Sequence, residues 1–352
     1  MKKILNIVIP AAVLIIIFLS TAFSNFTISG EDYIADIGGE KVTKAEYMIM
    51  LQVQRDKLLA ENNKLEQNEK REFWKTRLDG KLPADIVKDS TLDKIKEMKI
   101  QLIKARENSI FPDKGDEDKA RAYVDDLKLG LSGSKDGDVL EAEFIKKFGV
   151  TGKEYEAVYK EVLLIRKLVA GEAEKMQISE EEIKSYYDKY KDELDNYTVR
   201  DILFATVDLE TSEALSDDKV REAQRRAVET LNKAKAGADL EALAIDNSDD
   251  PDVETNKGLY TFKIQAQNKN EIDDWALKAK AGDMAIVQTF YGYHVVKLEK
   301  RSAYDEVKSD AREVLFEGKY LELLDSWKKE AKYSVNIKNQ KYLDSMDKLI
   351  EE

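Results

Sequence analysis

The segment MAIVQTFYGYHVVKLEKR, residues 284–301, predicts a β-hairpin that closes a small domain. Both halves are rich in residues that favour strands, and apolar and polar side chains alternate towards the end. The second half contains His294, the only histidine in the chain of 352 residues. A single histidine in such a run is usually structural, so its role has to be judged from the segments around it.

The segments before this hairpin predict a compact domain that mixes helices and strands. VRDILFATV, residues 199–207, is rich in β-branched and aromatic residues, which favour a strand. Helices are expected at 217–236, 239–250 and 270–282, with a short strand at 258–262. Together with the hairpin, these elements predict an α+β module at residues 197–301.

Capping boxes mark the starts of helices in the region before the module. Thr43 and Thr151 are each followed three residues later by a glutamate, and in such a pair each side chain satisfies the other's free backbone N–H. A third box begins at Ser179 and opens the helix that leads into the module. Residues 26–196 are therefore expected to form a helical domain.

The end of the chain predicts a long helix followed by a short strand. The helix covers residues 303–333, and SVNIK at 334–338 is the strand. A final strand after a helix indicates that residues 302–352 return to pair with the hairpin expected at 33–42. The module would then be inserted into one discontinuous helical domain.

The N-terminus predicts export of the chain. Two lysines precede an apolar stretch at residues 4–23, which is about long enough to span a bilayer. The small residues Ala22 and Ser24 also suit a cleavage site, so residues 1–25 are either a membrane anchor or a removable signal peptide. The lysines predict a cytoplasmic N-terminus, with everything after residue 25 exported.

Composition excludes several classes of function. The net charge is −13, which argues against nucleic acid as a partner because phosphate binding needs a basic face. The chain has no cysteine, so thiolate nucleophiles and disulfides are excluded, and one histidine cannot build a multi-histidine metal centre. A Ser-His-Asp triad would need His294, and no nucleophile-elbow sequence accompanies it. We therefore expect no metal and no cofactor.

The order of these segments resembles that of parvulin-type peptidyl-prolyl isomerases and of extracytoplasmic folding factors of the SurA, PrsA and PpiD kind. The resemblance implies a small antiparallel sheet flanked by helices, with a shallow groove for a proline ring. It also implies rotation about X–Pro bonds without covalent chemistry. The similar segments are IADIGGEKVTKAEY, ISEEEIKSYYDKYKDEL, LEALAIDNSDDP, KAKAGD, YGYHVVKLEKR and YDEVKSDAREVL.

Three candidate catalytic residues follow from this resemblance. His294 matches the second of two family histidines, whereas Asp201 stands where the first normally lies. Asp250 matches a position that is Cys or Asp in the family. Because strands alternate, Asp201 and His294 are expected to face one side of the sheet and to form a hydrogen bond between neighbouring strands. The alternative is that both residues only hold the register of the sheet.

The same resemblance implies an apolar pocket for the substrate. Leu259 and Phe262 match apolar positions in one strand, and Ile272 matches the pocket phenylalanine. Either Gln267 or Asn268 replaces the pocket methionine. An amide and an isoleucine in these places make the groove wetter and shallower, so affinity for proline should fall.

These observations predict an exported folding factor that binds unfolded or nascent polypeptides with exposed X–Pro and apolar segments. It would act in the periplasm or at the outer face of the cell membrane, in contact with the membrane through residues 4–23 if these are not cleaved. Isomerisation of X–Pro bonds, weakened by the altered pocket, is the first function to consider. The alternatives are a non-catalytic holdase with a degenerate module and an envelope scaffold with one partner.

Overall fold

The computed structural model describes residues 33–62, 72–132, 134 and 136–351 of the chain. Most of these residues lie in helices, and the strands form two small antiparallel sheets, so the fold class is α+β as predicted. The apolar stretch at 4–23 lies outside the described residues. Within the part described, no helix combines the length and the apolar composition that crossing a bilayer requires.

The chain divides into two compact units. One consists of residues 1–177 and 316–352 and is called the flanking unit, and the other, residues 178–315, is called the inserted unit. The inserted unit is longer than the module expected at 197–301, because one helix before the module and the start of one after it group with its sheet.

Helices make up most of the described part of the flanking unit. The capping boxes predicted at Thr43 and Thr151 are confirmed, and Asp113 begins a further box. Each box satisfies two N–H groups that the first turn of a helix leaves free. The helices are α1 (Lys44–Glu61), α3 (Pro83–Glu107), α4 (Lys114–Leu131), α5 (Gly137–Phe148), α6 (Gly152–Lys175), the 3₁₀ turn η1 (Ala331–Tyr333), α13 (Gln340–Asp344) and α14 (Asp347–Glu351).

A three-stranded antiparallel sheet joins the two segments of the flanking unit. β1 (Ala35–Ile37) lies between β2 (Glu40–Val42) and β7 (Val335–Ile337). The predicted return of the last strand to the N-terminal hairpin is therefore confirmed. Gly38 and Gly39 form the turn between β1 and β2 with φ of +60° and +89°, a conformation that costs glycine little.

A buried ion cluster crosses the core of the flanking unit. The ammonium of Lys99 on α3 contacts the carboxylate of Glu46 on α1, and its Nζ lies 3.3 Å from the Glu161 Oε1 on α6. Lys99 and Glu46 are almost fully buried, so the three helices share charges that water does not screen. One lysine thus faces two carboxylates.

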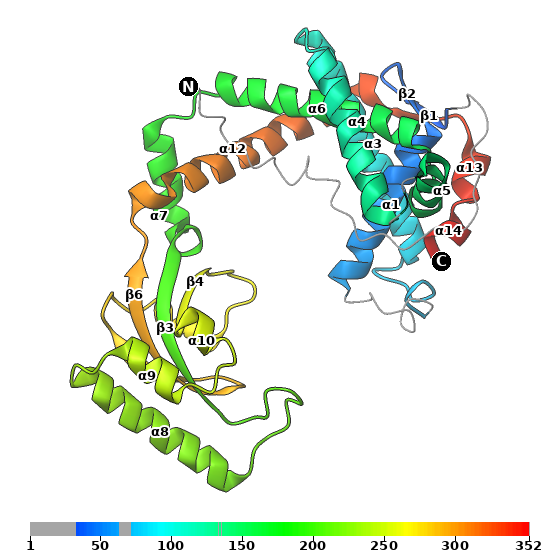
Figure 1. The fold of residues 1–352 in the computed structure, drawn as a ribbon. Helices are drawn as coiled ribbons and strands as arrows, with labels where there is room; N and C mark the ends of the chain where they lie inside the picture. The colour runs from blue at the N-terminus through cyan, green and yellow to red at the C-terminus, as the bar shows by residue number, and fades with distance from the viewer. Residues whose placement is uncertain (1–32, 63–71, 133, 135, 352) are drawn as a thin grey trace. The chain divides into compact units, whose positions relative to one another are not determined.

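The inserted unit is built on a four-stranded antiparallel sheet with strand order β4-β3-β6-β5. The long strands β3 and β6 run side by side at its centre, and β5 and β6 form the predicted hairpin (Figure 1). The strands are β3 (Asn196–Ala205), β4 (Leu259–Lys263), β5 (Met284–Gln288) and β6 (Gly292–Arg301). The helices are α7 (Glu180–Leu194), α8 (Asp217–Lys235), α9 (Leu240–Asn247), α10 (Val253–Asn256), α11 (Glu271–Ala276) and α12 (Tyr304–Lys328), which ends in the flanking unit.

The two faces of this sheet have different roles. Ile202 and Phe204 on β3 are buried with apolar residues of α8 and α9. Because side chains alternate along a strand, Val199 and Asp201 point to the other face. There Val199 packs with Leu298 and with apolar residues around α11. The helices α8 and α9 therefore support the sheet from one side and leave the other side for a site.

The strand register brings Asp201 and His294 close together. Asp201 lies opposite Val296, and Leu203 lies opposite His294, so Asp201 and His294 are diagonal neighbours on one face. Gly258 brings β4 against this point, because its carbonyl accepts the Asp201 N–H at 2.7 Å. A Cβ on Gly258 would lie 2.6 Å from the Asp201 carbonyl oxygen, and its φ is +74°. Only glycine fits there.

Candidate functional site

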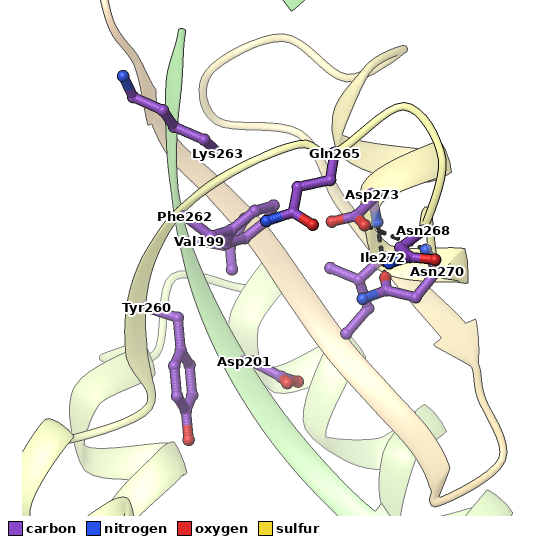
Figure 2. Close-up of a pocket in the computed structure, with 10 residues that line it drawn as sticks. All are labelled: Val199, Asp201, Tyr260, Phe262, Lys263, Gln265, Asn268, Asn270, Ile272 and Asp273. Atoms are coloured by element: carbon purple, nitrogen blue, oxygen red, sulfur yellow. Dashed lines mark hydrogen bonds between the residues drawn. The ribbon is translucent and has the colours of Figure 1, made fainter. Parts of the chain in front are cut away.

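A pocket of about 340 Å³ lies on the sheet face that carries Asp201 (Figure 2). Two neighbouring strands, β3 and β4, form one wall, and the segment that leads into α11 forms the other. The lining residues are Val199, Asp201, Tyr260, Phe262, Lys263, Gln265, Asn268, Asn270, Ile272 and Asp273.

The predicted hydrogen bond between Asp201 and His294 is confirmed. The His294 Nδ1 lies 3.0 Å from the Asp201 Oδ1 and 2.9 Å from its Oδ2. Only 14% of the Asp201 side chain and 8% of the His294 side chain are exposed. The carboxylate lines the pocket, whereas the imidazole is not among the lining residues. The pocket therefore presents an acidic group that the histidine holds in place.

Thr289 extends this pair into a chain of hydrogen bonds. Its Oγ1 lies 2.9 Å from the His294 Nε2 and accepts the Tyr291 N–H at 3.1 Å. Asp201 and Thr289 thus hold both ring nitrogens of His294 in hydrogen bonds, which fixes the orientation of the imidazole. Sequence reasoning missed Thr289, although a hydroxyl residue at the end of the first hairpin strand was an available signal.

Asp250 lies outside the pocket lining and acts on it through Tyr260. The Tyr260 hydroxyl donates a hydrogen bond to the Asp250 carboxylate. Burial first, and then this carboxylate, raise the pKa of Tyr260 well above its usual value. The phenol therefore stays protonated at neutral pH, and its ring forms part of the pocket wall. Tyr260 was not singled out in the sequence.

The expected apolar residues are only partly brought together. Phe262 and Ile272 both line the pocket, and so does Asn268, whereas Gln267 does not. Leu259 also lies outside the lining, contrary to the expectation that it binds substrate, and 41% of it is exposed. Alternation along β4 explains this, because Tyr260 and Phe262 point into the pocket and Leu259 points to the opposite face.

The arrangement suits binding and orientation rather than covalent chemistry. Three amide side chains line the pocket beside its three aliphatic or phenylalanine side chains, Val199, Phe262 and Ile272. The Lys263 ammonium lies 2.6 Å from the Asp310 carboxylate, and the Asp273 carboxylate caps α11. In the described ranges, no three His, Asp or Glu side chains converge as metal ligands would.

Comparison with known proteins places this site in a family. Residues 184–302 match the model of the PPIC-type PPIase domain. Over 318 residues the chain is 26% identical to the foldase protein PrsA of Caldanaerobacter subterraneus, a match that covers 87% of this chain and 89% of that protein. It is also 23% identical to the chaperone SurA of Nitrosospira multiformis, over 64% of this chain and 50% of the relative.

A solved structure, the peptidylprolyl isomerase PrsA of Bacillus anthracis, also resembles the chain. It aligns with 69% of this chain and 99% of its own at 24% identity, with a TM-score of 0.29. The family assignment therefore rests on the sequence matches. The domain match encloses the strands that carry Asp201 and His294.

Proposed function

Because the chain is a parvulin-type foldase of the SurA and PrsA kind, we propose that it catalyses cis–trans isomerisation of X–Pro bonds in exported polypeptides. The observation that carries this proposal is the Asp201–His294 pair beside the apolar residues Phe262 and Ile272. The inserted unit would act as the isomerase module. The flanking unit would hold unfolded segments near it.

The reaction needs a site that binds the twisted bond better than the planar one. Rotation about a peptide bond meets a barrier of about 18–20 kcal/mol because resonance is lost. The planar imide is the more dipolar form, so a pocket with little water disfavours it relative to the twisted form. We assign Phe262 and Ile272 to the proline ring, since apolar contact there removes water from the bond.

The polar residues would orient the chain that carries the proline. Asp201 accepts hydrogen bonds only, so it suits an N–H or a cationic group of the substrate backbone or side chain. His294 positions that carboxylate, and Asp250 positions the ring of Tyr260. We therefore assign binding to Asp201 and positioning to His294 and Asp250.

Isomerase activity is tested on the purified chain from residue 26 with a prolyl peptide, by NMR exchange spectroscopy without a coupled protease. We expect catalysis that falls about tenfold in His294→Ala, because the Asp201 carboxylate loses its buried partner. Leu259→Ala serves as the matched control and should keep the full rate. Unchanged catalysis in His294→Ala would remove this residue from the mechanism.

A holdase activity without catalysis is a second candidate function. Gln265, Asn268 and Asn270 make the pocket wall polar, which weakens the hold on a proline ring. If the holdase function dominates, the chain should suppress aggregation of a client that contains no proline as well as of one that does. Suppression confined to proline-containing clients would count against it.

We further propose that the protein acts outside the cytoplasm, with residues 4–23 as anchor or signal. Two lysines before an apolar stretch support this orientation. Fractionation of cells that express the full chain tests it. An anchored chain should stay with membranes, a cleaved one should appear in the extracytoplasmic fraction, and recovery in the cytoplasm would contradict export.

A further inference from the structure

The Asp201 carboxylate in the pocket wall can accept more hydrogen bonds than the protein supplies to it. The His294 Nδ1–H lies between the two Asp201 oxygens, and within the described residues no other side chain is hydrogen-bonded to them. A carboxylate has about four lone-pair sites. Most of its accepting capacity is therefore left for a group that enters the pocket.

In the part of the chain that the structure describes, no lysine or arginine forms an ion pair with this carboxylate. Lys263 is the only lysine or arginine in the lining, and it is paired with Asp310, which lies outside the lining. In Figure 2 its ammonium extends away from the other labelled side chains. The His294 imidazole, which is not part of the lining, forms hydrogen bonds with Asp201 at Nδ1 and with Thr289 at Nε2. From inside the pocket, the Asp201 carboxylate is therefore open to a basic group of the substrate.

A second carboxylate adds to the negative charge on this side. Asp250 accepts the Tyr260 hydroxyl hydrogen and so lies directly behind a lining residue. Both Asp201 and Asp250 act electrostatically on Tyr260. A substrate side chain that passes Tyr260 therefore meets a negative potential from two directions.

We propose that the pocket selects X–Pro segments with a lysine or arginine immediately before or after the proline. This inference rests on the proposed isomerase function and names its substrate class. The basic side chain would place its ammonium or guanidinium on Asp201 while the ring contacts Phe262 and Ile272. A glutamate in the same place would be repelled, and an uncharged side chain of equal length would gain nothing from the carboxylate.

The test uses peptides Ala-X-Pro-Phe and Ala-Pro-X-Phe in which X is lysine, norleucine or glutamate. Norleucine keeps the methylene stem of lysine and removes the charge. For at least one placement of X, we expect kcat/KM about fivefold higher for lysine than for norleucine, and lower again for glutamate. The lysine advantage should shrink from low to 0.5 M salt, at which the Debye length is about 4 Å.

Two variants locate the origin of this preference. Asp201→Asn should bring the ratio of lysine to norleucine close to one. Asp252→Asn removes the same charge from an exposed position outside the pocket lining and should leave the ratio unchanged. Circular dichroism is used to check that both variants fold. A ratio that survives Asp201→Asn would overturn the assignment.

Peptide binding, followed by NMR shifts of the wild-type chain, separates this inference from the proposed function. Turnover of all peptides with equal kcat/KM and equal binding would overturn the inference and leave isomerisation intact. Lysine-selective binding without turnover would support the inference and overturn the isomerase. If the chain neither turns over the peptides nor binds the lysine peptides selectively, both the inference and the proposed isomerase function are rejected.

Discussion

The Tyr320 hydroxyl donates a hydrogen bond of 2.8 Å to the Gln101 side chain, across 219 residues of sequence. Both residues are buried, Tyr320 on α12 and Gln101 on α3. This bond fastens the segment that returns from the inserted unit to the first part of the flanking unit. The flanking unit is thus held together by a buried polar contact between residues that lie far apart in the sequence.

Tyr320→Phe should destabilise the flanking unit by about 1–3 kcal/mol, because it leaves the buried Gln101 oxygen without a donor. Urea unfolding measures this through the fluorescence of Trp74, which is buried in the core of that unit. Tyr291→Phe, at an exposed turn of the inserted unit, is the control and should change stability by less than about 0.5 kcal/mol. Equal effects of the two changes would show that the bond contributes nothing.

Glu161→Gln should make the stability of the flanking unit depend less on pH. Burial and the nearby Glu46 carboxylate raise the pKa of Glu161 well above 4.5. A carboxyl whose pKa is raised by folding binds its proton more tightly in the folded state, so stability falls as pH rises above about 4.5. The glutamine variant lacks this loss.

The urea midpoint at pH 5 and at pH 8 measures that effect. The difference between Glu161→Gln and the natural chain should grow towards pH 8 in favour of the variant. Glu117→Gln, at an exposed position of α4, should show no such trend. A difference that is constant with pH would mean that Glu161 is charged throughout this range.

Thr289→Val should lower kcat/KM for a prolyl peptide about fivefold, because the His294 Nε2 loses its hydrogen-bond partner. Thr289→Ser keeps the hydroxyl and should retain most of the activity. The ¹⁵N shift of the imidazole Nε2 provides a direct readout, since it should change in the valine variant, in which this nitrogen has lost the Thr289 hydroxyl. Identical imidazole spectra of the valine variant and the natural chain would exclude a positioning role for Thr289.

Ile272→Phe should raise affinity for a prolyl peptide about threefold, because a larger apolar side chain covers more of the ring. Phe262→Ala should lower it about tenfold by removing the opposite contact, equivalent to about 1.4 kcal/mol. Peptide titration followed by NMR measures both changes. Leu259→Ala is the control outside the pocket, and a loss there as large as in Phe262→Ala would contradict the assigned lining.

Local patterns in the sequence predicted the elements well where one physical rule dominates. The capping boxes at Thr43 and Thr151 depend only on neighbouring residues, so they could be predicted without tertiary information. The hairpin of β5 and β6 and the diagonal pairing of Asp201 with His294 followed from strand alternation. The return of β7 to β1 followed from the order of the elements.

Contacts that depend on three-dimensional register were missed. Leu259 and Phe262 are three residues apart, so alternation puts them on opposite faces, and only one lines the pocket. Thr289 and Tyr260 act through partners on other elements, which no local pattern reveals. The buried cluster of Lys99 likewise joins three helices, so its contacts depend on tertiary packing and not on a local pattern.

The pairing of β7 with β1 sets an order of folding events during synthesis. The inserted unit is contiguous, so it can fold once residue 315 has emerged, whereas the flanking unit is complete only after residue 337 joins the sheet. During synthesis the inserted unit can thus finish folding before the flanking unit. Protease digestion of chains stalled at residue 330 should release an intact fragment of about 178–315 and degrade the remainder.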